Sequence, residues 1–162
     1  MRYEEEYQNS GGIYVDIELK PVSIENWYDC TKLNVKKEQN SVFPAPVVYW
    51  IAESKFVHDF ELRAIYSQDL LVGFIAFCKT PDDDGNHWIP ALMIDENHQG
   101  KGFGKKAMEK LIDLMSQNGC NKLMIGHRPD NLIAGNLYES LGFQKASEEI
   151  IDGEIVRFLQ LN

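Results

Sequence analysis

Apolar residues recur along this chain with two different periods, and the period predicts which stretches are strands and which are helices. A period of two, or a short apolar run, is typical of strands, whereas recurrence every three or four residues is typical of a helix that packs by one face. The expected strands cover 13–19, 62–67, 70–79, 87–94, 122–126, 143 onward and 154–161. One expected helix begins at Ser23, and three others cover 47–56, 103–117 and 131–140.

Turn residues separate these elements and set their order. Gln68-Asp69 predicts a tight hairpin between the second and third strands, and Asp152-Gly153 predicts another near the end of the chain. Gly73 lies inside the third strand and predicts a bulge or a close packing contact. The order β-α-α-β-β-β-α-β-α-β-β predicts an α+β fold, with residues 13–162 as a single domain and residues 1–12 as a flexible leader.

The composition narrows the classes of function. The chain of 162 residues carries a formal net charge of −9, which argues against a nucleic-acid binder and is compatible with a cationic substrate. No apolar run approaches the ~18 residues of a membrane span. The N-terminus has no signal-peptide core, so we expect a cytoplasmic protein with no membrane partner. Cys30, Cys78 and Cys120 lie far apart, which predicts free thiols and no metal site.

A glycine-rich stretch, Gln99-Gly100-Lys101-Gly102-Phe103-Gly104, lies between the expected strand 87–94 and the expected helix 103–117. Alternate glycines let the backbone approach a bulky anion, and main-chain N–H groups at a helix start bind phosphate. The spacing is not that of a Walker A loop, because Lys106 stands where the magnesium-holding hydroxyl belongs. It also lacks the third glycine of a dinucleotide loop, because Lys105 stands at that position.

The loop instead resembles the pyrophosphate loop of the GNAT superfamily of N-acetyltransferases, whose pattern Gln/Arg-x-x-Gly-x-Gly/Ala is met by Gln99, Gly102 and Gly104. A second stretch, Asn131-x-x-Ala134-x-x-Leu137-Tyr138-Glu139-x-x-Gly142-Phe143, is similar to that family's second signature and follows at the right distance. The resemblance covers roughly 13–161. It implies a mixed central sheet of about six to seven strands, splayed between the fourth and fifth strands.

Shorter matches look like the bacterial spermine/spermidine acetyltransferase group. They are Glu25-Asn26-Trp27, Glu38-Gln39, Phe43-Pro44-Ala45-Pro46, Met93-Ile94-Asp95 and Gly153-Glu154. The resemblance implies transfer of an acetyl group from acetyl-CoA to a small-molecule amine such as spermidine or spermine. Two alternatives stay open: another amine (a protein N-terminus, an aminoglycoside or an amino-acid derivative), or a CoA-binding regulator with little activity. Folds of this kind often dimerise, so a homodimer also stays open.

The resemblance also implies a cofactor site. Phosphate contacts are expected from the glycine loop, and the amide arm of the cofactor is expected along the edge of the strand before it. The expected cofactor contacts are Leu92, Met93, Ile94, Gln99, Gly100, Lys101, Gly102, Phe103, Gly104, Lys105, Asn131, Ala134 and Tyr138. Asn131 also suits a helix cap. No metal is expected.

Direct attack of an amine on a thioester sets three chemical tasks. A backbone N–H near Leu92 or Met93 is expected to stabilise the oxyanion. Tyr138, at the position of the family's catalytic tyrosine, is expected to protonate the departing thiolate, because a phenol of pKa ~10 enters the reaction protonated. The sequence leaves the base for the amine open, because Pro90 stands where relatives often have a glutamate. Glu154 is the favoured base, and the alternatives are Asp84, His87, Glu38 or no single base at all.

The acceptor side is expected to combine aromatic faces with carboxylates, which suit a flexible polycation. The candidates come from the first two helices and the segment between them: Trp27, Glu38, Gln39, Phe43, Trp50 and Glu53. Each aromatic residue of this set also suits a place in the core.

Overall fold

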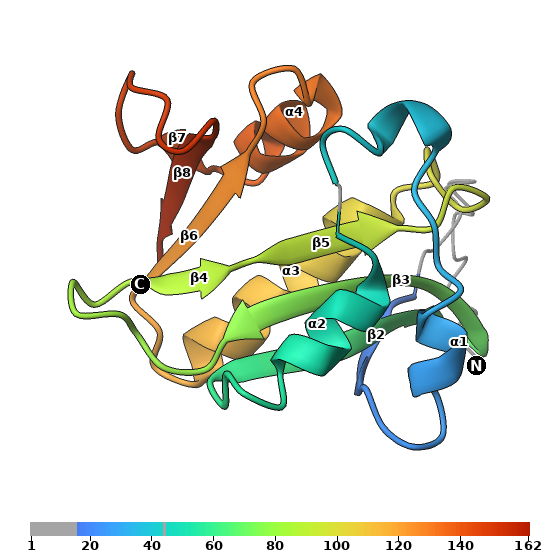
Figure 1. The fold of residues 1–162 in the computed structure, drawn as a ribbon. Helices are drawn as coiled ribbons and strands as arrows, with labels where there is room; N and C mark the ends of the chain where they lie inside the picture. The colour runs from blue at the N-terminus through green and yellow to red at the C-terminus, as the bar shows by residue number, and fades with distance from the viewer. Residues whose placement is uncertain (1–15, 44) are drawn as a thin grey trace, which may run out of the picture.

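Two four-stranded sheets meet where the chain passes through Pro90 in the computed structural model, which describes residues 16–43 and 45–162 (Figure 1). The strand orders are β1-β2-β3-β5 and β4-β6-β8-β7. The strands are β1 Glu18–Pro21, β2 Phe60–Ser67, β3 Leu70–Cys78, β4 His87–Ile89, β5 Ala91–Ile94, β6 Lys122–His127, β7 Gln144–Lys145 and β8 Ile155–Gln160. The helices are α1 Trp27–Cys30, the 3₁₀ turn η1 Lys37–Gln39, α2 Val47–Glu53, α3 Phe103–Gln117 and α4 Leu132–Ser140. The predicted α+β class is confirmed, and the helices and strands follow in the predicted order along the chain, except that the strand expected over 87–94 is divided into β4 and β5.

The strand expected over 87–94 is two strands, and this division opens the molecule. β5 pairs antiparallel with β3 in the first sheet, while β4 pairs parallel with β6 in the second. Pro90 lies between β4 and β5 and has no N–H to continue a ladder, so the chain changes sheet at this residue. β5 and β6 therefore diverge, which is the splay expected between these segments (Figure 1).

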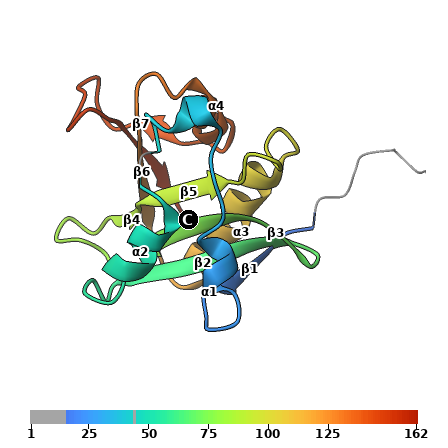
Figure 2. The same cartoon turned by 45° about the vertical axis from the view of Figure 1, so that its right-hand side comes forward.

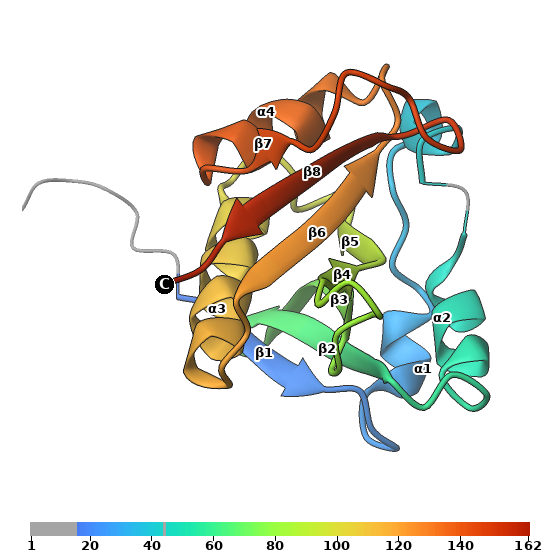
Figure 3. The same cartoon turned by 90° about the vertical axis from the view of Figure 1, so that its left-hand side faces the viewer.

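Helices cover both faces of the first sheet. Figure 3 shows α3 on one side of it and α1 and α2 on the other. Because successive strand residues point to opposite faces, Ile65 and Ile75 pack in the core with α3, whereas Ala64 and Phe74 pack in the core with α1 and α2. The helix predicted over 103–117 has the bounds of α3, and Ala107, Met108, Leu111 and Met115 are buried.

Two predictions about the N-terminal half fare differently. The leader over 1–12 lies outside the described residues, as do residues 13–15 of the strand expected over 13–19. In the described part, β1 begins at Glu18 and extends to Pro21. The helix expected from Ser23 is only the single turn α1, and Ile24 is 85% exposed rather than buried. Among the described residues, no helix has the length and apolar character needed to cross a membrane.

Gly73 lies next to a bulge and makes the close contact that its position predicts. The pairing register of β2 and β3 shifts between Ile65 and Tyr66, with Gly73 opposite Ile65. A Cβ atom at Gly73 would collide with the backbone carbonyl oxygen of Met93 in β5. Glycine is therefore required for β3 and β5 to pair this closely.

We expect Gly73→Ala to lower the free energy of unfolding by about 2 kcal/mol, because the backbone of β5 must move to admit the methyl group. Gly104→Ala is the matched control, since a Cβ there meets only the side chains of Ile94 at 3.5 Å and Leu137 at 3.6 Å. Denaturant unfolding of both variants measures the effect, and equal stability of the two would contradict this account of β5.

Candidate active site

A cleft of about 390 Å³ opens at the splay, bounded by β5, the glycine loop, α4 and the segment that precedes α2. Figure 2 shows this segment rising from α1 past β5 toward α4. Twelve of the thirteen predicted cofactor residues line the cleft, and Lys101 does not. The twelve are Leu92, Met93, Ile94, Gln99, Gly100, Gly102, Phe103, Gly104, Lys105, Asn131, Ala134 and Tyr138.

The glycine loop presents main-chain donors at the mouth of the cleft. Gly100 and Gly102 have left-handed φ angles of 75° and 84°, which turn the backbone into a concave loop. Gly102 is the N-cap of α3 and offers no side chain to cap it. The first turn of an α-helix leaves its N–H groups without helical acceptors. In α3, the first helical hydrogen bond is donated by the main-chain N–H of Lys106 to the Gly102 carbonyl at 3.2 Å. The amides of 103–105 are thus free to bind an anion.

The three loop lysines differ in their surroundings. Lys101 donates through Nζ to the carbonyl oxygen of Asn97 at 3.2 Å, and Lys106 forms an ion pair with Glu109 at 2.9 Å. Lys105 lines the cleft. Lys105 is therefore the lysine best placed to add positive charge to the donors of the loop.

The open edge of β5 offers a second row of main-chain groups. The N–H of Asp95 donates to Val72 of β3 at 2.9 Å. The main-chain N–H and C=O groups of successive strand residues point in opposite directions. Those of Met93 therefore also point toward β3, whereas those of Leu92 and Ile94 point toward the splay. The carbonyl of Ile94 already accepts from Gln99 Nε2 at 2.9 Å. The groups available to bind an extended amide chain are thus the main-chain N–H and C=O of Leu92 and the N–H of Ile94. The two N–H groups can also bind an oxyanion.

Tyr138 stands on α4 with its ring buried, 5% exposed, and it lines the cleft. Its ring packs 5.9 Å from the rings of His127 and Phe143. Its hydroxyl donates to no side chain or backbone group within the described part of the chain. Burial, and secondarily the negative charge of Glu154, raise the pKa of Tyr138 above its usual value. The phenol therefore stays protonated at neutral pH and can act as a proton donor.

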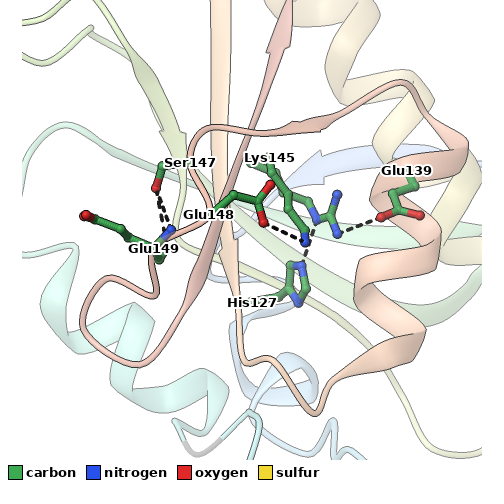
Figure 4. A network of polar contacts seen from close by, with 7 residues as sticks. His127, Glu139, Lys145, Ser147, Glu148 and Glu149 are labelled. Atoms are coloured by element: carbon green, nitrogen blue, oxygen red, sulfur yellow. Dashed lines mark hydrogen bonds and ion pairs between the residues drawn. The ribbon is translucent and has the colours of Figure 1, made fainter.

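Polar side chains from β6, β8 and α4 form a network beside α4, in which Arg157 and His127 are buried (Figure 4). Arg157 is 5% exposed, donates through Nε to His127 Nε2 at 2.8 Å, and forms an ion pair with Glu139 at 2.9 Å. Since guanidinium only donates, His127 Nε2 is the acceptor, and its Nδ1–H donates to the carbonyl of Arg128 at 2.9 Å. Burial, together with the charge of Arg157, lowers the pKa of His127. The imidazole is neutral and its lone pair is occupied, so His127 is not a base for the amine.

Glu154 lies beside this network and outside the lining of the cleft. Its carboxylate rests against Gly126 of β6, where any Cβ would collide with it. Its negative charge raises the pKa of Tyr138 and opposes the lowering of the pKa of His127. Asp84, His87 and Glu38, the other candidate bases, do not line the cleft either.

The cysteines do not offer a nucleophile. Burial and the nearby Asp29 raise the pKa of Cys30 to about 11, and burial and Asp59 do the same for Cys78. All three thiols are free, and none lines the cleft. Because a protonated thiol is a poor nucleophile, these cysteines are unsuited to form a covalent intermediate in the cleft. The described residues contain no group of three His, Cys, Asp or Glu side chains suited to a metal ion.

Comparison with known proteins identifies the family. Residues 22–143 match the Acetyltransferase (GNAT) family. The chain belongs to the GNAT family. It is an acetyl-CoA-dependent N-acetyltransferase, as the glycine loop and the second signature predict.

Individual relatives act on different amines. The chain is 29% identical over 153 residues to the spermine/spermidine N(1)-acetyltransferase of Bacillus subtilis, covering 91% of this chain and 100% of that protein. The spermidine N-acetyltransferase of Vibrio cholerae, crystallised with CoA and spermine, has a TM-score of 0.70 at 17% identity, covering 89% and 95% of the two chains. The ribosomal-protein-S18-alanine N-acetyltransferase of Escherichia coli has a TM-score of 0.69 at 16% identity, covering 91% and 95%. At these identities the two structures show the shared fold alone.

The structure divides the predicted acceptor residues of this acetyltransferase. Gln39 and Phe43 line the cleft. Glu38 is exposed on η1 outside the lining, and Trp27, 40% exposed, lines a separate hollow beside α2. Asn131 caps α4 by accepting from the Ala134 N–H at 3.2 Å while it lines the cleft.

Several cleft residues were not predicted as site residues. They are Val35, Lys36, Val42, His98, Ile133 and Leu137. Ile133 and Leu137 carried a usable signal, because they share a helix face with Ala134 and Tyr138 at helical spacing. Their apolar character instead predicted core positions, yet Ile133 is 71% exposed. Val35 and Val42 carried no signal, since they belong to an irregular segment.

Proposed function

We propose that this acetyltransferase acetylates a primary amine of a polyamine such as spermidine or spermine. The carrying observation is the 29% identity that extends over the whole length of the Bacillus subtilis spermine/spermidine acetyltransferase. Full-length similarity includes the N-terminal segment that walls the cleft, rather than only the shared glycine loop. The lining supports this proposal, since Phe43 offers an aromatic face. Glu38 is exposed on η1 in the same segment, and the chain carries a formal net charge of −9.

In our proposal, coenzyme A lies across the cleft. Its diphosphate accepts hydrogen bonds from the amides of 103–105 and draws on the charge of Lys105. Its amide arm runs along the open edge of β5 at Leu92, much as a peptide adds to a sheet. The N–H of Leu92 or Ile94 then stabilises the oxyanion. The Met93 N–H is removed from this role, because it faces β3.

The proposed reaction needs no covalent enzyme intermediate. The neutral amine nitrogen attacks the thioester carbon, a carbon–nitrogen bond forms, and the carbon–sulfur bond breaks. The amine has a pKa near ~10 and first loses one proton. Glu154 is the favoured acceptor of this proton, which reaches it through water. The thiolate leaves as Tyr138 donates its phenolic proton, and the phenol regains a proton as the amide nitrogen loses its second one.

A panel of amines tests the acceptor. We expect spermidine and spermine to give kcat/KM values at least about tenfold above those of a kanamycin-type aminoglycoside and of a peptide beginning with alanine, measured by release of free thiol. A higher value for the peptide would favour the protein N-terminus as acceptor. Binding of CoA without turnover of any amine would indicate a regulator instead.

A further inference from the structure

A pair of glutamine side chains joins the glycine loop to the opposite wall of the cleft. Gln99 Nε2 donates to Gln39 Oε1 at 2.8 Å, and Gln39 Nε2 donates back to Gln99 Oε1 at 3.0 Å. The second hydrogen of Gln99 Nε2 goes to Ile94 at 2.9 Å. Both N–H groups and the oxygen of the Gln99 side-chain amide are thus bonded to protein partners, so this side chain does not bind phosphate directly.

Gln39 belongs to residues 34–43, which we call the strap. The strap supplies Val35, Lys36, Gln39, Val42 and Phe43 to the lining of the cleft, and it runs from α1 up past β5 (Figures 1 and 2). Two attachments hold it to the segment after β5. At its root, the buried Asp95 carboxylate accepts from the Asn34 N–H at 3.1 Å, and the Glu96 N–H donates to the Asn34 carbonyl at 2.7 Å. The Gln39–Gln99 pair is the second attachment.

Gln39 also organises the strap itself. Its Oε1 accepts from the Lys36 N–H at 3.1 Å, and its carbonyl accepts from the N–H groups of Val42 at 3.0 Å and Phe43 at 2.9 Å. A movement of Gln39 therefore moves Phe43, which lines the same cleft as Met93 and Tyr138. Gln99, the first residue of the glycine loop, is thereby connected through its contact with Gln39 to the strap, which lines the side of the cleft proposed to receive the amine.

We propose that Gln39 is a positioning residue that couples the two substrates: coenzyme A, by fixing the glycine loop, fixes Gln99 and through it the strap that receives the amine. This inference rests on the proposed placement of the diphosphate at 103–105. Coupling of this kind is reciprocal, so a bound amine strengthens CoA binding by the same factor. The amide pair suits this role because it is neutral and satisfied only in one mutual orientation.

Hydrogen exchange with and without CoA separates this inference from the proposed function. In the wild-type protein we expect CoA to slow exchange at two places, the amides of 103–105 and the strap amides of Asn40, Val42 and Phe43. In Gln39→Leu we expect protection at 103–105 to persist and protection of the strap to disappear. Lys37→Gln, an exposed change on the same turn, is the control that keeps both. Absence of protection at 103–105 in the wild type refutes the cofactor site, whereas protection there without the strap refutes the coupling.

Kinetics and rescue give a second readout. Loss of the Gln39–Gln99 hydrogen bonds in Gln39→Leu is expected to raise KM for the amine about fivefold, while kcat stays within about twofold of the wild-type value. Gln39→Glu alone sets a carboxylate against Gln99 Oε1 and is expected to behave like Gln39→Leu. The double variant Gln39→Glu with Gln99→Arg restores the contact, since guanidinium can donate both to the carboxylate and to the Ile94 carbonyl. Failure of this double variant to recover strap protection, with 103–105 still protected, would overturn the role of the pair.

Discussion

Replacing Tyr138 by phenylalanine is expected to lower kcat about 100-fold while the affinity for coenzyme A stays nearly unchanged. The change removes one hydroxyl from a buried ring that otherwise keeps its packing against His127 and Phe143. General acid catalysis by a positioned group contributes ~10²–10⁴-fold, so the loss falls on the chemical step. Steady-state kinetics and calorimetric titration with CoA give the two quantities separately.

The pH dependence sharpens this prediction. Because burial raises the pKa of Tyr138, the phenol is protonated throughout the neutral range and produces no alkaline loss of activity near its ordinary pKa. The rate is expected to rise toward about pH 9–10 as the amine loses its proton. Tyr138→Phe should lower the whole profile without changing its shape. A profile that changes shape in the variant would mean that Tyr138 titrates as part of the rate-limiting step.

Tyr66→Phe is the matched control. Tyr66 is a half-buried residue of β2, lies outside the cleft, and has Lys20 Nζ 4.6 Å from its ring centroid. The control loses the same atom away from the site and is expected to keep its kcat. If Tyr138→Phe instead unfolds at lower denaturant and keeps its rate per folded molecule, Tyr138 is a packing residue.

Gly102→Val is expected to weaken the binding of coenzyme A about 100-fold, the effect of losing two charge-assisted hydrogen bonds from the loop amides. A Cβ at Gly102 meets no protein atom within 4 Å, so the branched side chain projects into space next to the loop. There it would obstruct the approach of a diphosphate to the amides of 103–105. The left-handed φ of 84° adds backbone strain of ~1–2 kcal/mol.

Gly85→Val separates the strain from the obstruction. Gly85 has a φ of 81° and lies in the turn before β4, outside the cleft, and a Cβ there would also meet no protein atom within 4 Å. Both variants are expected to lose similar unfolding free energy, and only Gly102→Val should lose affinity for CoA. Unchanged CoA affinity in Gly102→Val would argue that the diphosphate binds elsewhere.

Local patterns predicted residues that the structure brings together around one cleft. The glycine loop, α3 and α4 are contiguous segments whose chemistry and periodicity are written in neighbouring residues. Tyr138 and Asn131 therefore came out on the correct helix, and both line the cleft. The residues expected on the acceptor side are more scattered in the structure, because the segment between α1 and α2 is irregular and has no period. Trp27 was expected in the acceptor site, yet it lines a different hollow.

The sequence by itself determined the class of this protein: a glycine loop between a strand and a helix, and a second helix with a tyrosine at a fixed distance, in an α+β order. Those features depend on residues close together in the chain, where spacing alone decides which side chains share a face. Only the tertiary structure decided that the chain changes sheet at Pro90, that the Glu154 carboxylate rests against Gly126, and that Gln39 meets Gln99. These relations join residues far apart in the chain, and the packing of whole elements, rather than any local pattern, brings them into contact.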